Sequence, residues 1–271
     1  MKLLDKVDDL MRLKTVNQDS RKEAYKRLLL MHFESGVGHI GGNLSALDFL
    51  LILFKEYLCE TDKFILSKGH AAGALYVALW SIGRLADREL KFFHKDDTLL
   101  PGHPPARGND DIIFATGSLG HGLSLAAGTA LGIKLQNQKT KTYCMTSDGE
   151  WQEGSTWEAL IFACHHQLTN LTIIVDHNGL QGFGATDTTA SMSPLWNKIQ
   201  NFDIDLQVID GHQLSAIRSA LNRPNKLVKV IILKTIKGHG VSFMENKMEW
   251  HYLPLSVEQL SIAIQDIENK T

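Results

Sequence analysis

Residues 143–180 read YCMTSDGEWQEGSTWEALIFACHHQLTNLTIIVDHNGL. Two short apolar runs, at 143–146 and 171–175, enclose a segment with helical spacing at 156–167. Apolar runs that are nearly continuous are typical of parallel strands whose sheet is covered on both faces. The stretch therefore predicts a strand–helix–strand unit of an α/β fold.

The same alternation continues on both sides of this stretch. Further strand-like runs lie at 64–66, 206–209 and 228–233, and helical patterns lie at 75–82, 119–135, 214–221 and 257–267. Two more helices are expected before the first strand, at 21–34 and 45–57, separated by the glycine-rich SGVGHIGGN at 35–43. We expect a doubly wound parallel sheet flanked by helices, in a single domain over residues 1–271.

Composition excludes several classes of protein. The 271 residues carry a formal charge of −2 without a basic stripe, which argues against a nucleic-acid or membrane surface. The longest uncharged apolar run, at 49–54, is too short to span a bilayer, and residues 1–14 carry frequent charges rather than a secretory leader. Cys59, Cys144 and Cys164 are too widely spaced for a disulfide framework or a zinc motif. We expect a cytoplasmic protein with reduced cysteines.

Histidines that follow glycine are over-represented. Six of the 12 histidines do so, namely His39, His70, His103, His121, His212 and His239. Glycine permits tight turns and close approach of a ligand, so we expect these imidazoles on loops that face a shared cleft. An ordinary role in a turn or in the core explains one such pair better than six.

Oxygen-bearing side chains follow two of the expected strands. Asp148 comes after the first strand of the opening stretch and Asn178 after the second. Ligands of parallel α/β sheets bind outside the carboxyl ends of the strands, and magnesium prefers oxygen ligands beside phosphate. Gly149 would let the backbone approach such phosphates. The alternative, that Asp148 caps a helix and Asn178 shapes a turn, stays open on these two residues alone.

The sequence resembles six motifs of the transketolase family, in the family's order. The segments SDGEWQEGSTWEA (147–159) and IIVDHNGLQ (173–181) together resemble its thiamine diphosphate motif. The other five motifs match GHIGGNLSALD (38–48), SKGHAAGALYVALW (67–80), LPGHPP (100–105), ATGSLGHGLSLAAGTALG (115–132) and KTIKGHGVSFMENKMEWHYLPL (234–255). The resemblance implies the thiamine-diphosphate-binding fold and covers roughly residues 36–255.

The resemblance also implies roles for individual residues. Asp148, Asn178 and the backbone carbonyl of Leu180 would hold Mg²⁺ or another divalent cation such as Ca²⁺. Contacts to the diphosphate would come from His70, Gly149 and His251, and contacts to the cofactor rings from Gly117 and Leu119. Around the reactive carbon the resemblance places His39, His70, His103 and His251. Two acidic positions of the family, which join carboxylates across its dimer interface, match Glu153 and Glu158. The resemblance implies a catalytic and cofactor-binding role for Glu153.

The implied reaction moves a two-carbon ketol unit from a ketose to an aldose, with the cofactor as electron sink. Imidazoles that titrate near neutrality suit the proton transfers of this reaction. We expect His103 and His251 to carry most of them.

The sequence departs from the family in several places. Ser147 replaces a glycine, His121 replaces a glutamine, and residues 181–184 lack the usual aliphatic and Asp-Gly ending. In the family, a second domain carries the catalytic glutamate and the aromatic residue that stacks on the pyrimidine ring, and we expect this chain to lack that domain. We therefore expect a separate C-terminal transketolase subunit that carries the pyrimidine-binding domain, two copies of each chain in a heterotetramer, and a sugar substrate.

Three other interpretations fit parts of the sequence. A nicotinamide-dependent Rossmann enzyme is disfavoured because residues 182–187 lack the third glycine and GSLGHG has the wrong spacing. A zinc hydrolase could use His39, His70 and His103 as ligands. A non-catalytic regulatory relative of the same fold is the main alternative, although such a role needs none of the candidate site residues.

Overall fold

The computed structural model describes residues 14–269, so most of the stretch that argued against a secretory leader lies outside the described residues. The chain divides into two compact units, each made of separate segments. Among the described residues, the first unit comprises 14–58, 70–102 and 236–269, and the second comprises 59–69 and 103–235. A single domain over residues 1–271 stays a prediction.

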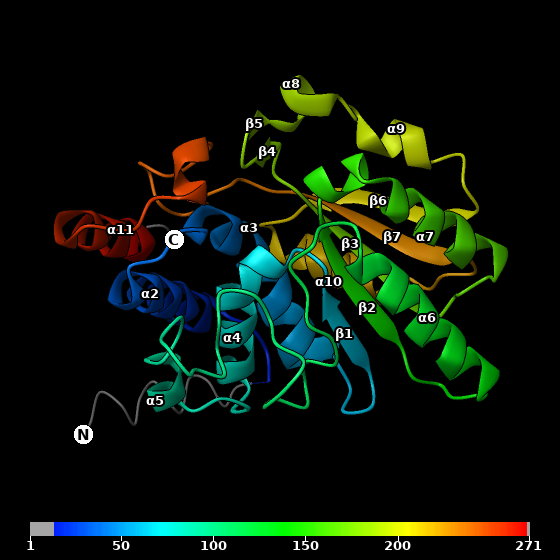
Figure 1. Ribbon diagram of the computed structural model, residues 1–271, viewed down its shortest axis with the longest axis horizontal. Helices are drawn as coiled ribbons and strands as arrows, with labels where there is room; N and C mark the ends of the chain where they lie inside the picture. The colour runs from blue at the N-terminus through cyan, green and yellow to red at the C-terminus, as the bar shows by residue number, and fades with distance from the viewer. Residues whose placement is uncertain (1–13, 270–271) are drawn as a thin grey trace. The chain divides into compact units, whose positions relative to one another are not determined.

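The second unit contains a five-stranded parallel sheet (Figure 1). Its strands lie in the order β1 (Lys63–Leu66), β2 (Thr142–Ser147), β3 (Leu171–His177), β7 (Val228–Lys234) and β6 (Ile204–Asp210). Every neighbouring pair is parallel. All five predicted strands are present, and the predicted fold class is confirmed.

Helices cover the two faces of this sheet. On one face, α6 (Gly122–Leu135) and α7 (Gly154–His165) pack side by side. Their apolar residues share a core with alternate residues of β3 and β7, among them Ile173, Val175, Val230 and Ile232.

The opposite face carries α10 (Leu214–Asn222). Lys229 alternates with Val228 and Val230 along β7, so its side chain points away from α6 and α7. Its Nζ donates to the carbonyl oxygens of Leu221, at 3.2 Å, and of Arg223, at 2.6 Å, at the end of α10. The sheet is therefore doubly wound, as the sequence predicts.

Several short elements of the second unit were not predicted. They are η3 (Gly149–Gln152), β4 (Leu180–Gln181), β5 (Gly184–Ala185), α8 (Thr186–Ala190) and α9 (Leu195–Ile199). Strands β4 and β5 form a small antiparallel hairpin in which Leu180 pairs with Ala185. Phe183 lies at its tip and is 88% exposed.

The first unit is helical. It contains α2 (Gln18–Ser35), α3 (Ile40–Ile52), the π-helical turn η1 (Leu53–Tyr57), α4 (Ala72–Ser81), α5 (Asp87–Leu90), η4 (Met248–His251) and α11 (Val257–Asn269), and η2 (Gly69–Ala71) runs into it from the second unit. At the start of α2 the Asn17 side chain accepts from Ser20 N at 2.8 Å, while Asn17 N donates to Ser20 Oγ at 3.1 Å. Gly36, with φ 67°, ends the helix.

The predicted start of the next helix, at residue 45, is wrong. Helix α3 begins at Ile40, directly after His39, whose backbone is left-handed with φ 64°. Gly41 lies inside this helix, on a closely packed face. A Cβ there would lie 3.0 Å from Lys237 Cγ and 3.3 Å from Trp250 Cβ. The glycine therefore serves close packing rather than a chain break.

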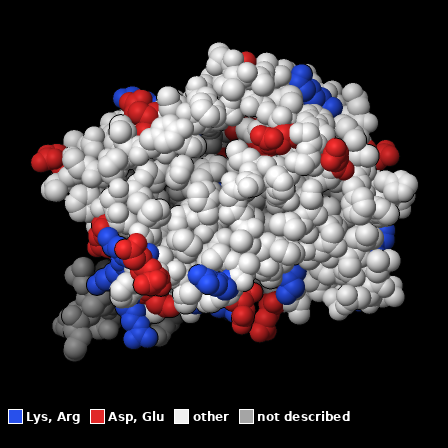
Figure 2. Space-filling model, viewed as in Figure 1, with Lys and Arg blue, Asp and Glu red and all other residues white. Residues whose placement is uncertain are grey.

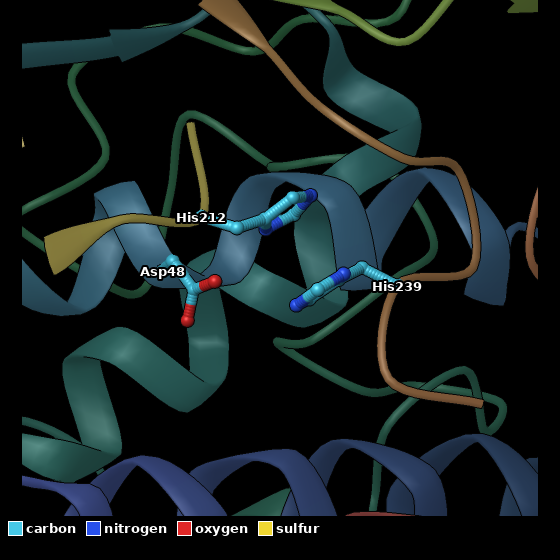
Figure 3. A group of neighbouring side chains, drawn as sticks. All are labelled: Asp48, His212 and His239. Carbon is cyan, nitrogen blue, oxygen red and sulfur yellow. The ribbon is translucent and has the colours of Figure 1, made fainter. Parts of the chain in front are cut away.

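A partly buried ion pair joins two helices of the first unit. The Arg21 guanidinium of α2 binds both carboxylate oxygens of Asp48 on α3, at 2.6 and 2.7 Å. Figure 3 shows Asp48 beside His239, and Arg21 Nη2 lies 3.3 Å from His239 Nε2. Burial alone would lower the pKa of Arg21, but the hydrogen bonds and charge of Asp48 outweigh it and raise that pKa above its usual range. The guanidinium therefore stays charged.

The distribution of surface charge and the lengths of the apolar helices agree with the composition. On the face drawn in Figure 2, lysines and arginines are scattered in small groups, several of them beside aspartates and glutamates. Across residues 14–269, every helix is too short or too polar to traverse a bilayer.

His32 gives the first unit a pH-dependent stability. The ring is 1% exposed, and burial lowers its pKa to about 4 from an ordinary 6.5, although Leu28 O accepts a hydrogen bond from it. Because the unfolded chain takes up this proton first, stability should fall as the pH drops from 6.5 toward 4, by up to about 3 kcal/mol. Urea unfolding across this pH range measures the loss.

His32→Gln should remove much of this loss, because the amide does not titrate. The exposed His165 provides the control, and His165→Gln should keep the wild-type pH dependence. Equal pH dependence of wild type and His32→Gln would contradict the prediction.

Candidate functional site

The loops after β2 and β3 meet at Asp148. One carboxylate oxygen accepts from Gly149 N at 2.8 Å, and the other accepts from Gly179 N at 2.6 Å, in the loop that carries Asn178. Asp148 N also donates to Asp176 O at 3.2 Å. Burial raises the pKa of Asp148, while the charge of His177 and the Gly179 hydrogen bond partly oppose this. The aspartate therefore lies against the asparagine loop, as the strand order requires.

The residues at this edge fit a diphosphate held through a divalent cation. Asp148 carboxylate, Asn178 amide and Leu180 carbonyl offer only oxygen donors, the set that magnesium prefers. Asn178 Oδ1 lies 3.1 Å from Leu180 N, which accounts for the bend between them. Gly149 leaves open the space where a Cβ would lie 3.0 Å from Gln181 Oε1. Within residues 14–269, the buried Nε2 of Gln181 has no hydrogen-bond partner, so it has donors to offer a ligand.

A second carboxylate, Glu150, lies wholly buried beneath this loop. It accepts hydrogen bonds from Ser147 N at 2.8 Å and Gly120 N at 3.0 Å, and a short one from Ser67 Oγ. Burial raises its pKa, and these donors partly oppose the rise. Ser147 Oγ lies 3.4 Å from the same carboxylate, so the residue that replaces the family's glycine joins this network. Glu150 thus ties the ends of β1 and β2 to the 115–121 loop.

A buried ion pair lies at the same edge of the sheet. Lys68, just after β1, binds Asp176 near the end of β3, and both side chains are fully buried. Thr235, just after β7, also donates to Asp176. Because β2 lies between β1 and β3, the pair spans the strand that leads to Asp148. The three residues fix the strand ends around the Asp148 loop.

His103 and Gly117 line an open pocket of about 610 Å³ in the second unit, together with His121 and Leu125. Gly117 has φ 153°, and a Cβ on it would lie 3.1 Å from His103 Cδ2. His121 Nδ1 lies 3.1 Å from Leu119 O, at the start of α6. His121 therefore shares the pocket of His103.

Three further candidate histidines cluster in the first unit. The ring centroids of His39 and His251 lie 4.8 Å apart, those of His70 and His251 5.5 Å, and those of His39 and His70 5.7 Å. Asn43, 1% exposed, holds two of them, because its Nδ2 donates to His39 O at 2.8 Å and to His70 O at 3.1 Å. Its Oδ1 accepts from Ala74 N at 2.7 Å. One amide thus fixes both histidine-bearing turns.

The acidic candidates lie at the surface. Glu153 and Glu158 are exposed at the start of α7, and a Cβ on Gly120 would lie 2.7 Å from Glu153 Cβ. Leu119 is 36% exposed.

Sequence reasoning missed the supporting residues Lys68, Asp176, Glu150, Asn43 and Lys237. The signal for Lys68 and Asp176 is a lone charge at the end of an apolar strand. Glu150 lies within the quoted SDGEW motif, and Lys237 within KTIKGHG. Their partners lie far away in the chain, so their burial could not be inferred from local pattern.

Comparison with known proteins shows which family this chain belongs to. The family profile for the thiamine diphosphate binding domain of transketolase matches residues 23–267. The chain belongs to the transketolase family. The match covers most of the chain and confirms the predicted family and its thiamine-diphosphate-binding domain.

Relatives of similar length are named as transketolase subunits. The chain is 33% identical to an apulose-4-phosphate transketolase subunit of Actinobacillus succinogenes, over 92% of this chain and 95% of that one. It is 35% identical to a 6-deoxy-6-sulfo-D-fructose transketolase subunit of a Clostridium species, over 87% and 90%. These similarities confirm the prediction of a transketolase-type transferase subunit.

Single-chain transketolases are much longer. The chain is 35% identical to human transketolase but spans only 39% of it. The transketolase of Campylobacter jejuni superposes with a TM-score of 0.85 at 28% identity, over 94% of this chain and 43% of that one. The chain thus corresponds to the diphosphate-binding part of those enzymes.

Proposed function

We propose that this chain is the diphosphate-binding subunit of a two-chain, thiamine-diphosphate-dependent transketolase. The observation that carries the proposal is the Asp148 carboxylate, which binds its own loop and the loop of Asn178 at once. The family match to a thiamine diphosphate binding domain supports it. The reaction is the transfer of a two-carbon ketol unit from a ketose to an aldose.

Each candidate residue has a proposed task. Asp148, Asn178 and the Leu180 carbonyl hold Mg²⁺, and Gly149, His70 and His251 bind the diphosphate. Leu119 and Gly117 contact the cofactor rings. When bound, the cofactor supplies an electron sink for cleavage of a carbon–carbon bond.

The histidines of the chain are proposed to move the protons of the reaction. His103 and His251 accept and return protons at sugar oxygens, and His39 and His70 orient the reacting groups. Imidazoles suit this task because their ordinary pKa is near neutrality. Glu153 is proposed to join a carboxylate of another chain near the cofactor.

The second chain is proposed to be a C-terminal transketolase subunit with the pyrimidine-binding domain. This chain spans 39% of human transketolase but 95% of a relative that is itself named as one subunit of a transketolase, which supports a separate partner. Two copies of each chain would form a heterotetramer, which size-exclusion chromatography of co-expressed chains can test. A cytoplasmic location also belongs to the proposal. It is supported by Cys59, Cys144 and Cys164, which are free thiols.

The substrate is proposed to be a sugar or sugar phosphate outside central pentose metabolism. Two relatives are named for apulose-4-phosphate and for 6-deoxy-6-sulfo-D-fructose. Residues 181–184, which depart from the family pattern, form the exposed hairpin that ends at Phe183.

Calorimetry of thiamine diphosphate with Mg²⁺ tests the function. We expect tight binding to the co-expressed two-chain complex, weak binding to this chain alone, and loss of binding when a chelator removes the metal. Thiamine monophosphate, which lacks the terminal phosphate, is the matched ligand control. Absence of binding to the complex would overturn the proposal.

A turnover assay separates the enzyme from a non-catalytic regulatory relative. The complex should transfer a ketol unit from a generic donor such as hydroxypyruvate to an aldose. A complex that binds the cofactor but does not turn over any ketol donor would instead favour the regulatory role.

A further inference from the structure

A lysine is buried against one of the clustered imidazoles. Lys237 is 1% exposed, and its Nζ lies 2.9 Å from Nδ1 of His251. An ammonium group has three N–H donors and no acceptor, so the imidazole nitrogen at this distance acts as the acceptor. Nδ1 of His251 therefore carries no proton, and the proton of the neutral ring is on Nε2.

The lysine is fixed along its length. Its stem passes over Gly41, where a Cβ would lie 3.0 Å from Lys237 Cγ. Gly238 N donates to Gly41 O at 2.9 Å, and Asn246 N donates to Lys237 O at 2.9 Å. The backbone on both sides of the lysine is thus held, and its ammonium group has little freedom to leave the ring.

The imidazole is fixed as well. Trp250, 3% exposed, anchors η4 through its indole N–H, which donates to Phe243 O at 3.1 Å. The carbonyl oxygen of His251 accepts from His39 N at 3.0 Å. The ring therefore keeps its place beside the lysine.

We infer that Lys237 is a positioning residue that locks His251 as the Nε2–H tautomer. The inference deepens the proposed function, on which its catalytic consequence rests. In this tautomer Nε2 carries the proton and is the hydrogen-bond donor of the ring. His251 then begins the reaction as a proton donor to a phosphate or sugar oxygen, and His103 is left as the base.

Nitrogen NMR of the ¹⁵N-labelled full chain tests the tautomer without cofactor or substrate. Long-range ¹H–¹⁵N correlation distinguishes protonated from unprotonated ring nitrogens, and His251→Gln identifies the signals of His251. We expect an unprotonated Nδ1 and a protonated Nε2 in the wild-type chain. A protonated Nδ1 in the neutral ring of the wild-type chain would overturn the inference, regardless of the spectra of the variants.

Lys237→Met should remove the lock. The two nitrogen signals of His251 should move toward each other as both tautomers become populated. The other titratable groups against the ring, His39, His70 and Tyr252, are unchanged in this variant. A wild-type spectrum from Lys237→Met would contradict the inference.

Two variants control the experiment. Lys237→Arg keeps N–H donors at the site and should keep the tautomer, which also covers the case in which Lys237→Met does not fold. Lys247→Met removes an exposed ammonium group just before η4 and should leave the spectrum unchanged. Failure of the tautomer test leaves cofactor binding by calorimetry unaffected, so the two proposals fail independently.

Discussion

Asp148→Ala should abolish magnesium-dependent binding of thiamine diphosphate and lower kcat/KM of the two-chain complex by at least about 100-fold. Loss of a residue that only supports a metal ligand typically costs about 10–100-fold, and a direct ligand should cost more. The variant also frees Gly149 N and Gly179 N, which now donate to the carboxylate at 2.8 and 2.6 Å. Calorimetry and initial rates with hydroxypyruvate measure both losses.

The control for this variant is an exposed aspartate in the same region. Asp187→Ala, at the start of α8, should retain cofactor binding and turnover. Asp148→Asn keeps the side-chain size but removes the charge and one acceptor oxygen, and should resemble Asp148→Ala in cofactor binding. Cofactor binding within about threefold of the wild type in both Asp148 variants would remove the aspartate from the proposed metal set.

Lys68→Met should lower the free energy of unfolding by about 3–5 kcal/mol. The substitution leaves the Asp176 carboxylate charged and fully buried without the ammonium that now binds it. Thr235 still donates to that carboxylate, but one neutral hydroxyl replaces little of an ionic partner. Urea unfolding of the purified chain, followed by circular dichroism, measures the loss.

A double-mutant cycle separates the ion pair from simple loss of packing. Lys68→Met with Asp176→Leu removes both charges and should cost much less than the sum of the single substitutions. The exposed Lys141, just before β2, is the matched surface control, and Lys141→Met should change stability by less than about 0.5 kcal/mol. Additive single substitutions would show that the two charges do not interact.

The strands were predictable because each carries its own signal. Residues 171–175 are apolar throughout except for Thr172, and the structure places β3 there with both faces covered. Boundaries near glycine were less predictable. Helix α6 begins at Gly122 rather than at 119, because Gly120 has φ 81° and interrupts the helical backbone. The two-residue strands β4 and β5 have no periodicity that a sequence could display.

The candidate ligands were easier to find than the residues that hold them. Asp148 and Asn178 each follow a recognisable strand, so strand order alone brings their loops together. Lys68 and Asp176 are partners across a sheet and 108 positions apart, and neither residue signals the other. Lys237 and His251 lie in one quoted segment, but only the packing over Gly41 shows that the lysine turns inward.

At His39 the left-handed backbone favours glycine, whereas the site requires an imidazole side chain. With φ 64°, a residue that has a Cβ gives up about 1–2 kcal/mol of conformational energy that glycine would not. Glycine at this turn would make the fold more stable but would remove the imidazole. A histidine here therefore costs the chain some stability, and His39→Gly should raise the free energy of unfolding while it removes the ring that we propose orients the reacting groups.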